Sequence, residues 1–275
     1  MKTVLIATDY SSAAKNASKY GIQLARILKA KVILLHSYHI PVLATEVPVI
    51  ADFDELEKEN LRTILAEKKL LDPQMELDIE CISCFGFVVD NIIETEKLYK
   101  PDLIIMGMRA VGVLSEYLLG SITTTLILRT KSPIMIIPEH SEFIPPKKIT
   151  FACDYNLNPN VDILMPLKKL VEFFDSKMMI LNFLKQDHTV GSKKAKMGIL
   201  VENYLKDIAH TYYFEEEKDF IDGIIHFTGK HDTDLIALVP HHHSWIHNLF
   251  KGSHTKRLAF HTTIPLLTIP ERDQD

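Results

Sequence analysis

Short apolar runs alternate along this chain with longer segments whose apolar residues recur at helical spacing. The alternation begins at the N-terminus and continues to about residue 137. It predicts five strands, over Val4–Thr8, Val32–His36, Leu77–Ser83, Leu103–Met106 and Ile134–Ile137. It predicts four helices, over Ala13–Leu28, Asp54–Leu71, Phe87–Tyr99 and Ile122–Leu128. Apolar strands separated by helices are typical of an α/β fold, in which helices cover both faces of a parallel sheet.

The pattern then repeats. A strand that ends in Asp-Tyr opens each half, at Asp9-Tyr10 and at Asp154-Tyr155, which are 145 residues apart. Gly120-Ser121 and Gly252-Ser253 match at a shorter offset of 132, so the second half has lost about a dozen residues in between. The segment after Pro138 loses periodicity and contains a proline pair. We therefore expect domains over residues 1–139 and 148–275, joined by a linker over 140–147.

One stretch of the first half has the features of a phosphate-binding loop. Gly107 follows an apolar run and allows a sharp turn, and Gly120-Ser121 precedes a predicted helix, where free N–H groups attract anions. There is no Walker lysine. The same glycines could instead only shape the loop and cap the helix. In such sheets a ligand usually binds beyond the C-terminal strand ends, at the switch point.

The spacing of these residues resembles that of the universal stress protein family. The family signature is Gly, two residues, Gly, nine residues, then Gly followed by Ser or Thr, and Gly107, Ala110, Gly120 and Ser121 fall on it. The resemblance covers nearly the whole chain. It implies two tandem Rossmann-like domains of the adenine nucleotide alpha hydrolase-like kind, each an open five-stranded parallel sheet flanked by helices.

The resemblance also implies that ATP or another adenine nucleotide binds in the N-terminal domain. An aspartate contacts the ribose or adenine end, the strand end flanks the base, the loop wraps the ribose and phosphates, and the helix start holds the phosphates. The residues at these positions are Asp9, Met106, Gly107, Arg109, Ala110, Gly120, Ser121 and Thr123. Asp9 could equally cap the helix that follows it.

Both halves depart from the signature. Ala110 replaces a glycine, which costs about 1–2 kcal/mol if the loop needs a positive φ there. In the second half Val239 and His242 stand at the two leading glycine positions, so we predict that this half binds no nucleotide in the family's manner. Gly252-Ser253 could still hold a lone anion.

Two residue clusters invite metal or redox chemistry. The histidines between His241 and His254 could bind a metal, but adjacent histidines point apart, and we predict a polar loop with no metal site. Cys81 and Cys84 lie in a predicted strand, where an odd separation places them on opposite faces. We therefore expect neither redox nor metal chemistry at this pair.

Catalytic motifs are missing. The chain has no Ser-Gly-Gly-x-Asp loop after its first strand, no Gly-x-Ser-x-Gly elbow and no Walker sequence. We expect at most slow ATP hydrolysis and predict a stress-response regulator or sensor with unknown protein partners. The alternative is an interaction module of the same fold that binds no nucleotide.

Composition and the last strands bear on partners. The 275 residues carry a formal charge of -5, which gives no general attraction for nucleic acid or an anionic membrane. No apolar run could cross a bilayer and no signal peptide is evident, so we expect a cytoplasmic protein.

Family dimers pair the last strands of their sheets. We expect the edges Pro133–Pro138 and Pro265–Pro270 to pair within this chain as a pseudo-dimer.

Overall fold

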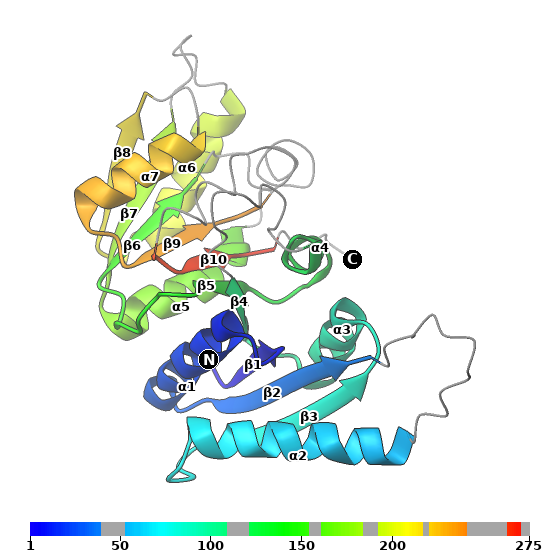
Figure 1. Cartoon of the computed structure of the whole chain (residues 1–275). Coiled ribbons are helices and arrows are strands. Elements are labelled where there is room, and N and C mark those ends of the chain that lie inside the picture. Colours follow the sequence, from blue (N-terminus) through cyan, green and yellow to red (C-terminus); the bar gives the residue numbers. More distant parts are fainter. Residues whose placement is uncertain are drawn as a thin grey trace.

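A computed structural model describes residues 1–39, 53–108, 121–153, 161–183, 192–216, 220–240 and 263–270 of the chain. Strands and helices alternate in both halves (Figure 1). The first half contains β1 (Thr3–Thr8), α1 (Ser12–Leu28), β2 (Lys31–Tyr38), α2 (Phe53–Leu71), β3 (Ile79–Phe85), α3 (Val88–Tyr99), β4 (Leu103–Met108), α4 (Ser121–Arg129) and β5 (Ile134–Pro138). The second half contains β6 (Lys148–Ala152), the 3-10 turn η1 (Val161–Leu164), α5 (Met165–Phe174), β7 (Lys177–Phe183), α6 (Ser192–Leu205), β8 (His210–Glu215), α7 (Phe220–His231), β9 (Leu235–Leu238) and β10 (Leu266–Thr268).

All ten described strands form one sheet, in the order β3-β2-β1-β4-β5-β10-β9-β6-β7-β8. Neighbouring strands are parallel within each half, and β5 and β10 are antiparallel where the halves meet. The order reads the same from either end once each strand is replaced by its counterpart. The α/β prediction, with a five-stranded parallel sheet in each half, is therefore confirmed.

The register at the junction has twofold symmetry. Met135 lies opposite Leu267, and these two residues are counterparts in the repeat because they are 132 positions apart (267 minus 135). Ile136 and Ile134 pair with Leu266 and Thr268 on either side. The same strand of each half therefore faces its own counterpart, as in an isologous dimer. The predicted pairing of the two edges within one chain is confirmed.

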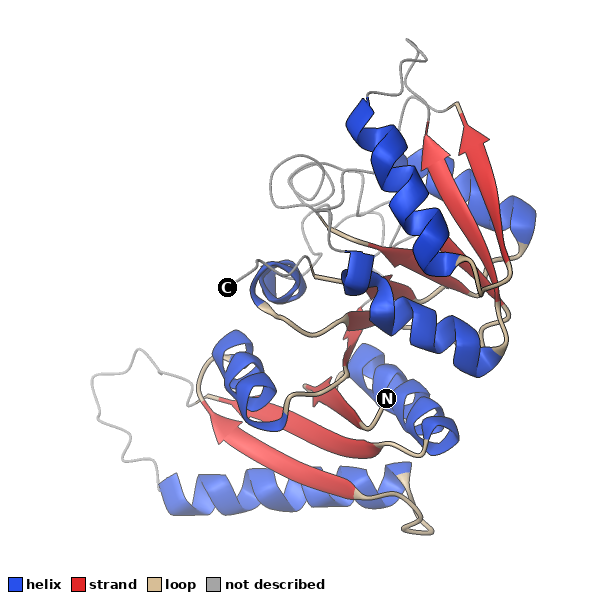
Figure 2. Cartoon of the chain, turned by 180° about the vertical axis from the view of Figure 1, so that it is seen from behind, coloured by secondary structure: helices blue, strands red, loops and turns tan. Residues whose placement is uncertain are grey.

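Helices lie on both faces of the sheet (Figure 2), and an apolar layer lies between the helices and the sheet on each face. On one face, side chains of α1, α2, α5 and α6 pack against strand residues such as Val4 and Leu103. On the other face, α3, α4 and α7 pack against the alternate strand residues, such as Leu5 and Ile104. Successive strand residues point to opposite faces, so strands buried on both sides need apolar residues throughout. This requirement explains the continuous apolar runs in the sequence.

The two cysteines of β3 lie as the strand pattern predicts. Cys81 packs against the layer beneath α2, whereas Cys84 packs against the layer beneath α3, so the pair is on opposite faces of the sheet. Partial burial raises the pKa of both thiols, which makes them poor nucleophiles. Both cysteines are free.

Candidate functional site

A cavity of about 470 Å³ opens at the C-terminal ends of β1 and β4. Chain connections run in opposite directions from these two neighbouring strands, because β2 lies beyond β1 and β5 lies beyond β4. This is the switch point, where open α/β sheets bind ligands. Four of the residues implied by the family resemblance line the cavity: Asp9, Met106, Gly107 and Thr123. They come from the turn after β1, from β4 and from α4, which are far apart in the sequence.

Gly107 is required by the packing of α1 against β4. It lies inside β4, where it pairs with Ile137, and not in a turn after the strand as predicted. A Cβ atom at this position would be 2.4 Å from the carbonyl oxygen of Ala13 and 2.7 Å from the nitrogen of Ala14. Both atoms belong to the backbone at the start of α1, which cannot rotate away. The glycine therefore lets the N-terminus of α1 reach the cavity.

The start of α1 is built from three consecutive residues. Ser11 is the N-cap, since its hydroxyl accepts a hydrogen bond from the backbone N–H of Ala14 at 3.3 Å. Asp9 is exposed, and its Oδ1 accepts a hydrogen bond from the backbone N–H of Ser11 at 3.0 Å. Asp9 thus supports the cap without being the N-cap itself. The first turn of α1 contains no acidic residue, so its positive dipole end is not neutralised from within the helix.

Tyr10 takes a strained conformation between these two residues. Its φ is 61°, in the left-handed region that residues other than glycine seldom adopt. Its ring lies 4.3 Å from that of His36 (centroid to centroid), and the Nδ1 of His36 is 2.9 Å from the carbonyl oxygen of Thr8. Burial, with a smaller contribution from the charge of Glu67, raises the pKa of Tyr10 to about 12. The ring contact between Tyr10 and His36 therefore anchors the turn after β1.

Thr123 and Ser121 belong to the first turn of α4. Thr123 is 6 % exposed and lines the cavity, whereas Ser121 begins the helix and its side chain lies outside the described residues. Arg109, Ala110 and Gly120 also lie outside the described residues. The structure therefore brings four of the eight predicted site residues to one cavity.

Sequence reasoning missed the wall of the cavity that β2 and α3 supply. Ser37 lies near the C-terminal end of β2 and His39 follows it, and Val88 and Ile92 belong to α3. The side-chain amide nitrogen of Asn91 donates a hydrogen bond to the hydroxyl of Ser37 at 3.1 Å. The signal was available, because parallel strands all end at the same edge of the sheet, and β2 is the next strand beyond β1.

The second half carries a larger residue at the position of Gly107. The pairing of β9 with β10 places Val239 at the position of Gly107, 132 residues later, and Val239 is 3 % exposed in the core. The counterpart of Ser12 is residue 157 (12 plus 145), which lies outside the described residues, and the described part of this segment begins with η1 at Val161 and continues into α5. A side chain at the position of Gly107 excludes the backbone of Ala13 in the first half, so Val239 is incompatible with a helix start in the same place.

The histidines from His241 onward, Gly252-Ser253 and Asp154 lie outside the described residues. Within the described ranges, no group of three or more His, Cys, Asp or Glu side chains could hold a metal ion. Nor does any helix in that part of the chain have the length and apolar character to cross a membrane.

The parallel sheet with helices on both faces places the chain among the α/β proteins with an open sheet. Residues 1–138 match the profile of the universal stress protein family, and the chain belongs to this family. It is similar to the universal stress protein Slr1230 of Synechocystis, with 22% identity over 297 residues that cover 98% of this chain and 99% of the relative. The universal stress protein MJ0577 of Methanocaldococcus jannaschii is 28% identical over 153 residues, which cover 50% of this chain and 94% of that protein.

A solved structure shows the same arrangement of two halves. The crystal structure of a universal stress protein from Archaeoglobus fulgidus covers 99% of this chain, and this chain covers 97% of it, with a TM-score of 0.75 and 16% sequence identity. The likeness supports the fold of the whole chain. The chain is thus a tandem universal stress protein, with two halves of the family fold joined in one sheet.

Proposed function

We propose that this tandem universal stress protein binds an adenine nucleotide in its first half and serves as a stress-response regulator or sensor, and not as a dedicated enzyme. The observation that carries the proposal is the cavity at the switch point, which Asp9, Gly107 and Thr123 all line. Its volume of about 470 Å³ is in the range of small-molecule sites. The proposal treats residues 1–139 and 148–275 as the two domains and 140–147 as the linker.

The described residues suit a nucleotide in two respects. Asp9 has a second carboxylate oxygen, Oδ2, that makes no hydrogen bond within the described chain and can accept one from a ribose hydroxyl or an adenine amino group. The N-termini of α1 and α4 both border the cavity, and helix N-termini stabilise phosphate groups. Nucleotide binding would alter the affinity for a protein partner by favouring one conformation of the site.

The second half is proposed to bind no nucleotide. Val239 places a buried side chain at the position where Gly107 leaves room for the start of α1 in the first half. We therefore expect one nucleotide per chain.

The test is a thermal unfolding experiment with ATP and AMP, together with analysis of the nucleotide released when the purified protein is denatured. A nucleotide at 100 times its Kd stabilises the folded state by about 2.7 kcal/mol. This corresponds to a rise in Tm of roughly 5–10 °C for a protein of this size. Isothermal titration calorimetry should give a stoichiometry of one.

The variant Asp9→Asn separates binding from folding. Asparagine keeps the oxygen that accepts the hydrogen bond from Ser11 but loses the charge, so the free protein should unfold at nearly the same temperature. We expect a loss of about tenfold or more in affinity, because hydrogen bonds to a charged group contribute about 1.5–3 kcal/mol. Asp207→Asn, an exposed site in the turn after α6, is the matched control and should bind as the wild type does.

One observation favours the interaction module that binds no nucleotide. The packing of α1 alone explains why position 107 is a glycine, so the glycine is not by itself a sign of a ligand. This second function would be supported if neither ATP nor AMP at millimolar concentration changed the Tm, and if Gly120→Val left the behaviour of the protein unchanged.

A further inference from the structure

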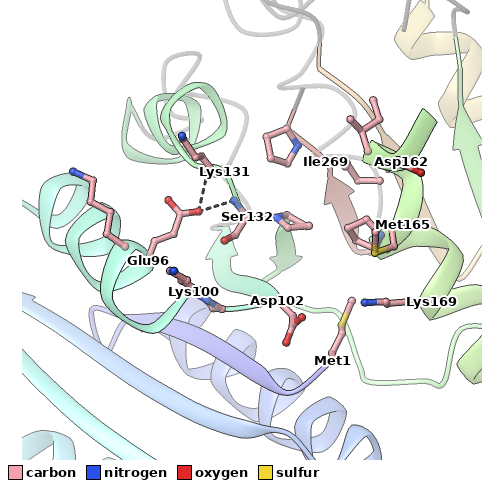
Figure 3. A pocket seen from close by; sticks show the side chains of 16 residues that line it. Met1, Glu96, Lys100, Asp102, Lys131, Ser132, Asp162, Met165, Lys169 and Ile269 are labelled. Carbon is pink, nitrogen blue, oxygen red and sulfur yellow. Dashed lines mark hydrogen bonds between the residues drawn. The ribbon is translucent and has the colours of Figure 1, made fainter. Parts of the chain in front are cut away.

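A second cavity of about 520 Å³ lies between the halves, at the opposite edge of the sheet from the first. The two cavities share no lining residue. The first half contributes the N-terminal ends of β1, β4 and β5, and the second half contributes η1, the first turn of α5 and the segment after β10 (Figure 3). We call it the junction cavity.

Apolar side chains and prolines are half of the 16 residues that line the junction cavity. Pro101 and Pro133 precede β4 and β5, and Ile163, Met165 and Ile269 approach from the second half. Met165 is 43% exposed, although it is a large apolar side chain at the first position of a helix. Ligand sites are lined in this way, by apolar surface with a few polar groups that orient the ligand.

Four lysines stand around this apolar wall: Lys97, Lys100, Lys131 and Lys169. They come from α3 and its C-cap, from the turn before β5, and from α5. Lys169 extends from the second half toward Met1, while Lys100 and Lys131 lie on the side of the first half (Figure 3). The lysines therefore approach the cavity from both halves of the chain.

Two of the three acidic residues in the wall are already engaged by backbone groups. Oε1 of Glu96 accepts hydrogen bonds from the backbone N–H groups of Lys131 and Ser132, at 2.9 Å and 2.5 Å. Oδ2 of Asp102 accepts from the backbone N–H groups of Lys2 and Thr3, at 2.6 Å and 3.1 Å.

Glu96 holds the turn before β5 and Asp102 holds the N-terminus of the chain, and within the described residues neither carboxylate forms an ion pair with a lysine. Lys97, Lys100 and Lys169 form no ion pair with any residue of the described chain. Their positive charge is therefore available to a ligand.

A pseudo-twofold axis relates the two halves, so the junction cavity has an equivalent position on the other side of this axis. The linker covers that equivalent position. The hydroxyl of Ser141 donates a hydrogen bond to the carbonyl oxygen of Thr263, and the ring of Phe143 meets that of Tyr20 edge to face with a centroid distance of 4.9 Å. The side chain of Asn16 donates to the carbonyl oxygens of Pro138 and Ser141, at 3.0 Å and 2.9 Å. A single linker can cover only one of the two symmetric positions. The junction cavity is the position that the linker leaves open.

We propose that the junction cavity binds a small organic anion that has an apolar body and one terminal carboxylate or phosphate group. The body lies against Pro101, Met165 and Ile269, and the anionic group lies between Lys100 and Lys169. The ligand contacts both halves and therefore stabilises their junction. This site is independent of the nucleotide site proposed in the first half.

Isothermal titration calorimetry of the full chain with octanoate and with octyl phosphate tests the proposal. Octanamide is the neutral control, and inorganic phosphate is the control without an apolar body. We expect one binding event for octanoate, for octyl phosphate or for both, and the result identifies the preferred anionic group. We expect binding of octanamide and of inorganic phosphate to be weaker by at least about tenfold, because each lacks one of the two interactions. Saturating ATP should leave the binding of the octyl probe unchanged.

Charge reversal tests the lysines. Lys100→Glu and Lys169→Glu, one from each half, should each weaken binding on the order of tenfold, because a partly exposed attraction becomes a repulsion. Lys206→Glu, an exposed site in the turn after α6, is the matched control and should change the affinity by less than about twofold. All three sites are exposed, so the variants should fold normally.

Four outcomes would overturn the proposal. The first is that neither anion binds at millimolar concentration, and the second is that octanamide binds as tightly as the anions. The third is that Lys206→Glu loses as much affinity as Lys100→Glu and Lys169→Glu, and the fourth is that ATP competes with the octyl probe. A fifth outcome is binding only by a variant that ends at Pro270 and not by the full chain. Residues 271–275, three of which are acidic, would then be the natural occupant, and the proposal of a separate ligand would be wrong.

Discussion

The contact between Gly107 and the start of α1 allows a quantitative prediction. Gly107→Ala adds a single Cβ atom, which would lie 2.4 Å from the carbonyl oxygen of Ala13, whereas ordinary contacts are 3.4 Å or longer. Relief of the clash needs a displacement of about 1 Å between the first turn of α1 and β4. Overpacking of this kind costs about 1–3 kcal/mol, and more where the neighbour is backbone.

Two other glycines provide a scale for the same change. At Gly229, an exposed position in α7, an added Cβ meets nothing within 4 Å. Gly229→Ala should therefore stabilise the protein by about 0.5–1 kcal/mol through the helix propensity of alanine. At Gly21 the nearest atom is Cδ1 of Ile6 at 2.7 Å, which is the end of a flexible side chain. We expect Gly21→Ala to fall between the other two.

Urea unfolding followed by circular dichroism measures the three free energies. The difference between Gly229→Ala and Gly107→Ala should be about 2–4 kcal/mol. Gly107→Ala should also weaken the binding of any nucleotide, because α1 carries the cap that Asp9 supports. If Gly107→Ala were as stable as the wild type while Gly229→Ala behaved as expected, the close approach of α1 to β4 would not be what requires a glycine here.

Two further predictions concern buried polar groups. Burial raises the pKa of Tyr10 to about 12 and that of Tyr20 further, so the folded protein keeps both phenolic protons at pH values where the unfolded chain, with an ordinary pKa of 10.0, has lost them. This contribution to stability is fully present below pH 10.0 and is lost as the pH rises toward the folded pKa values. The free energy of unfolding in urea should therefore fall above about pH 10. If a double Tyr→Phe variant showed the same fall with pH, the two tyrosines would not be its cause. The side chain of Asp72 is 1% exposed and accepts hydrogen bonds from the backbone N–H of Leu77 and from the guanidinium of Arg26, both at 2.9 Å. Asp72→Ala should lower the free energy of unfolding, measured in urea, by about 1–3 kcal/mol, mainly because the backbone N–H of Leu77 loses its partner. A decrease of less than about 0.5 kcal/mol would mean that water replaces the carboxylate.

The alternation of apolar runs predicted the order of elements in the first half because strands covered on both faces need continuous apolar residues. The same reasoning placed the end of β4 too early. Gly107 interrupts the apolar pattern and suggests a turn, yet the strand continues to Met108 because Gly107 and Met108 pair with Ile137 and Pro138 of β5. Strand ends depend on the neighbouring strand, and no local pattern records this.

The effect of Val239 could not be predicted for a related reason. The two halves repeat the same strand followed by the same dipeptide, at Asp9-Tyr10 and Asp154-Tyr155. Val239 follows β9, which pairs with the opening strand β6 only once the sheet has formed. The junction cavity escaped prediction too, because its wall is assembled from both halves.

The pair of counterparts Gly107 and Val239 connects stability with function in this fold. Val239 is 3% exposed, and burial of a valine side chain contributes about 1.5–3 kcal/mol to the half that contains it. Glycine at the same position forgoes this contribution and allows the helix N-terminus to border a cavity. One strand end cannot do both, because the Cβ atom and the backbone of the helix compete for the same space. The first half has glycine at this position and the second half has valine. We therefore expect ligand binding at the switch point only in the half that has glycine.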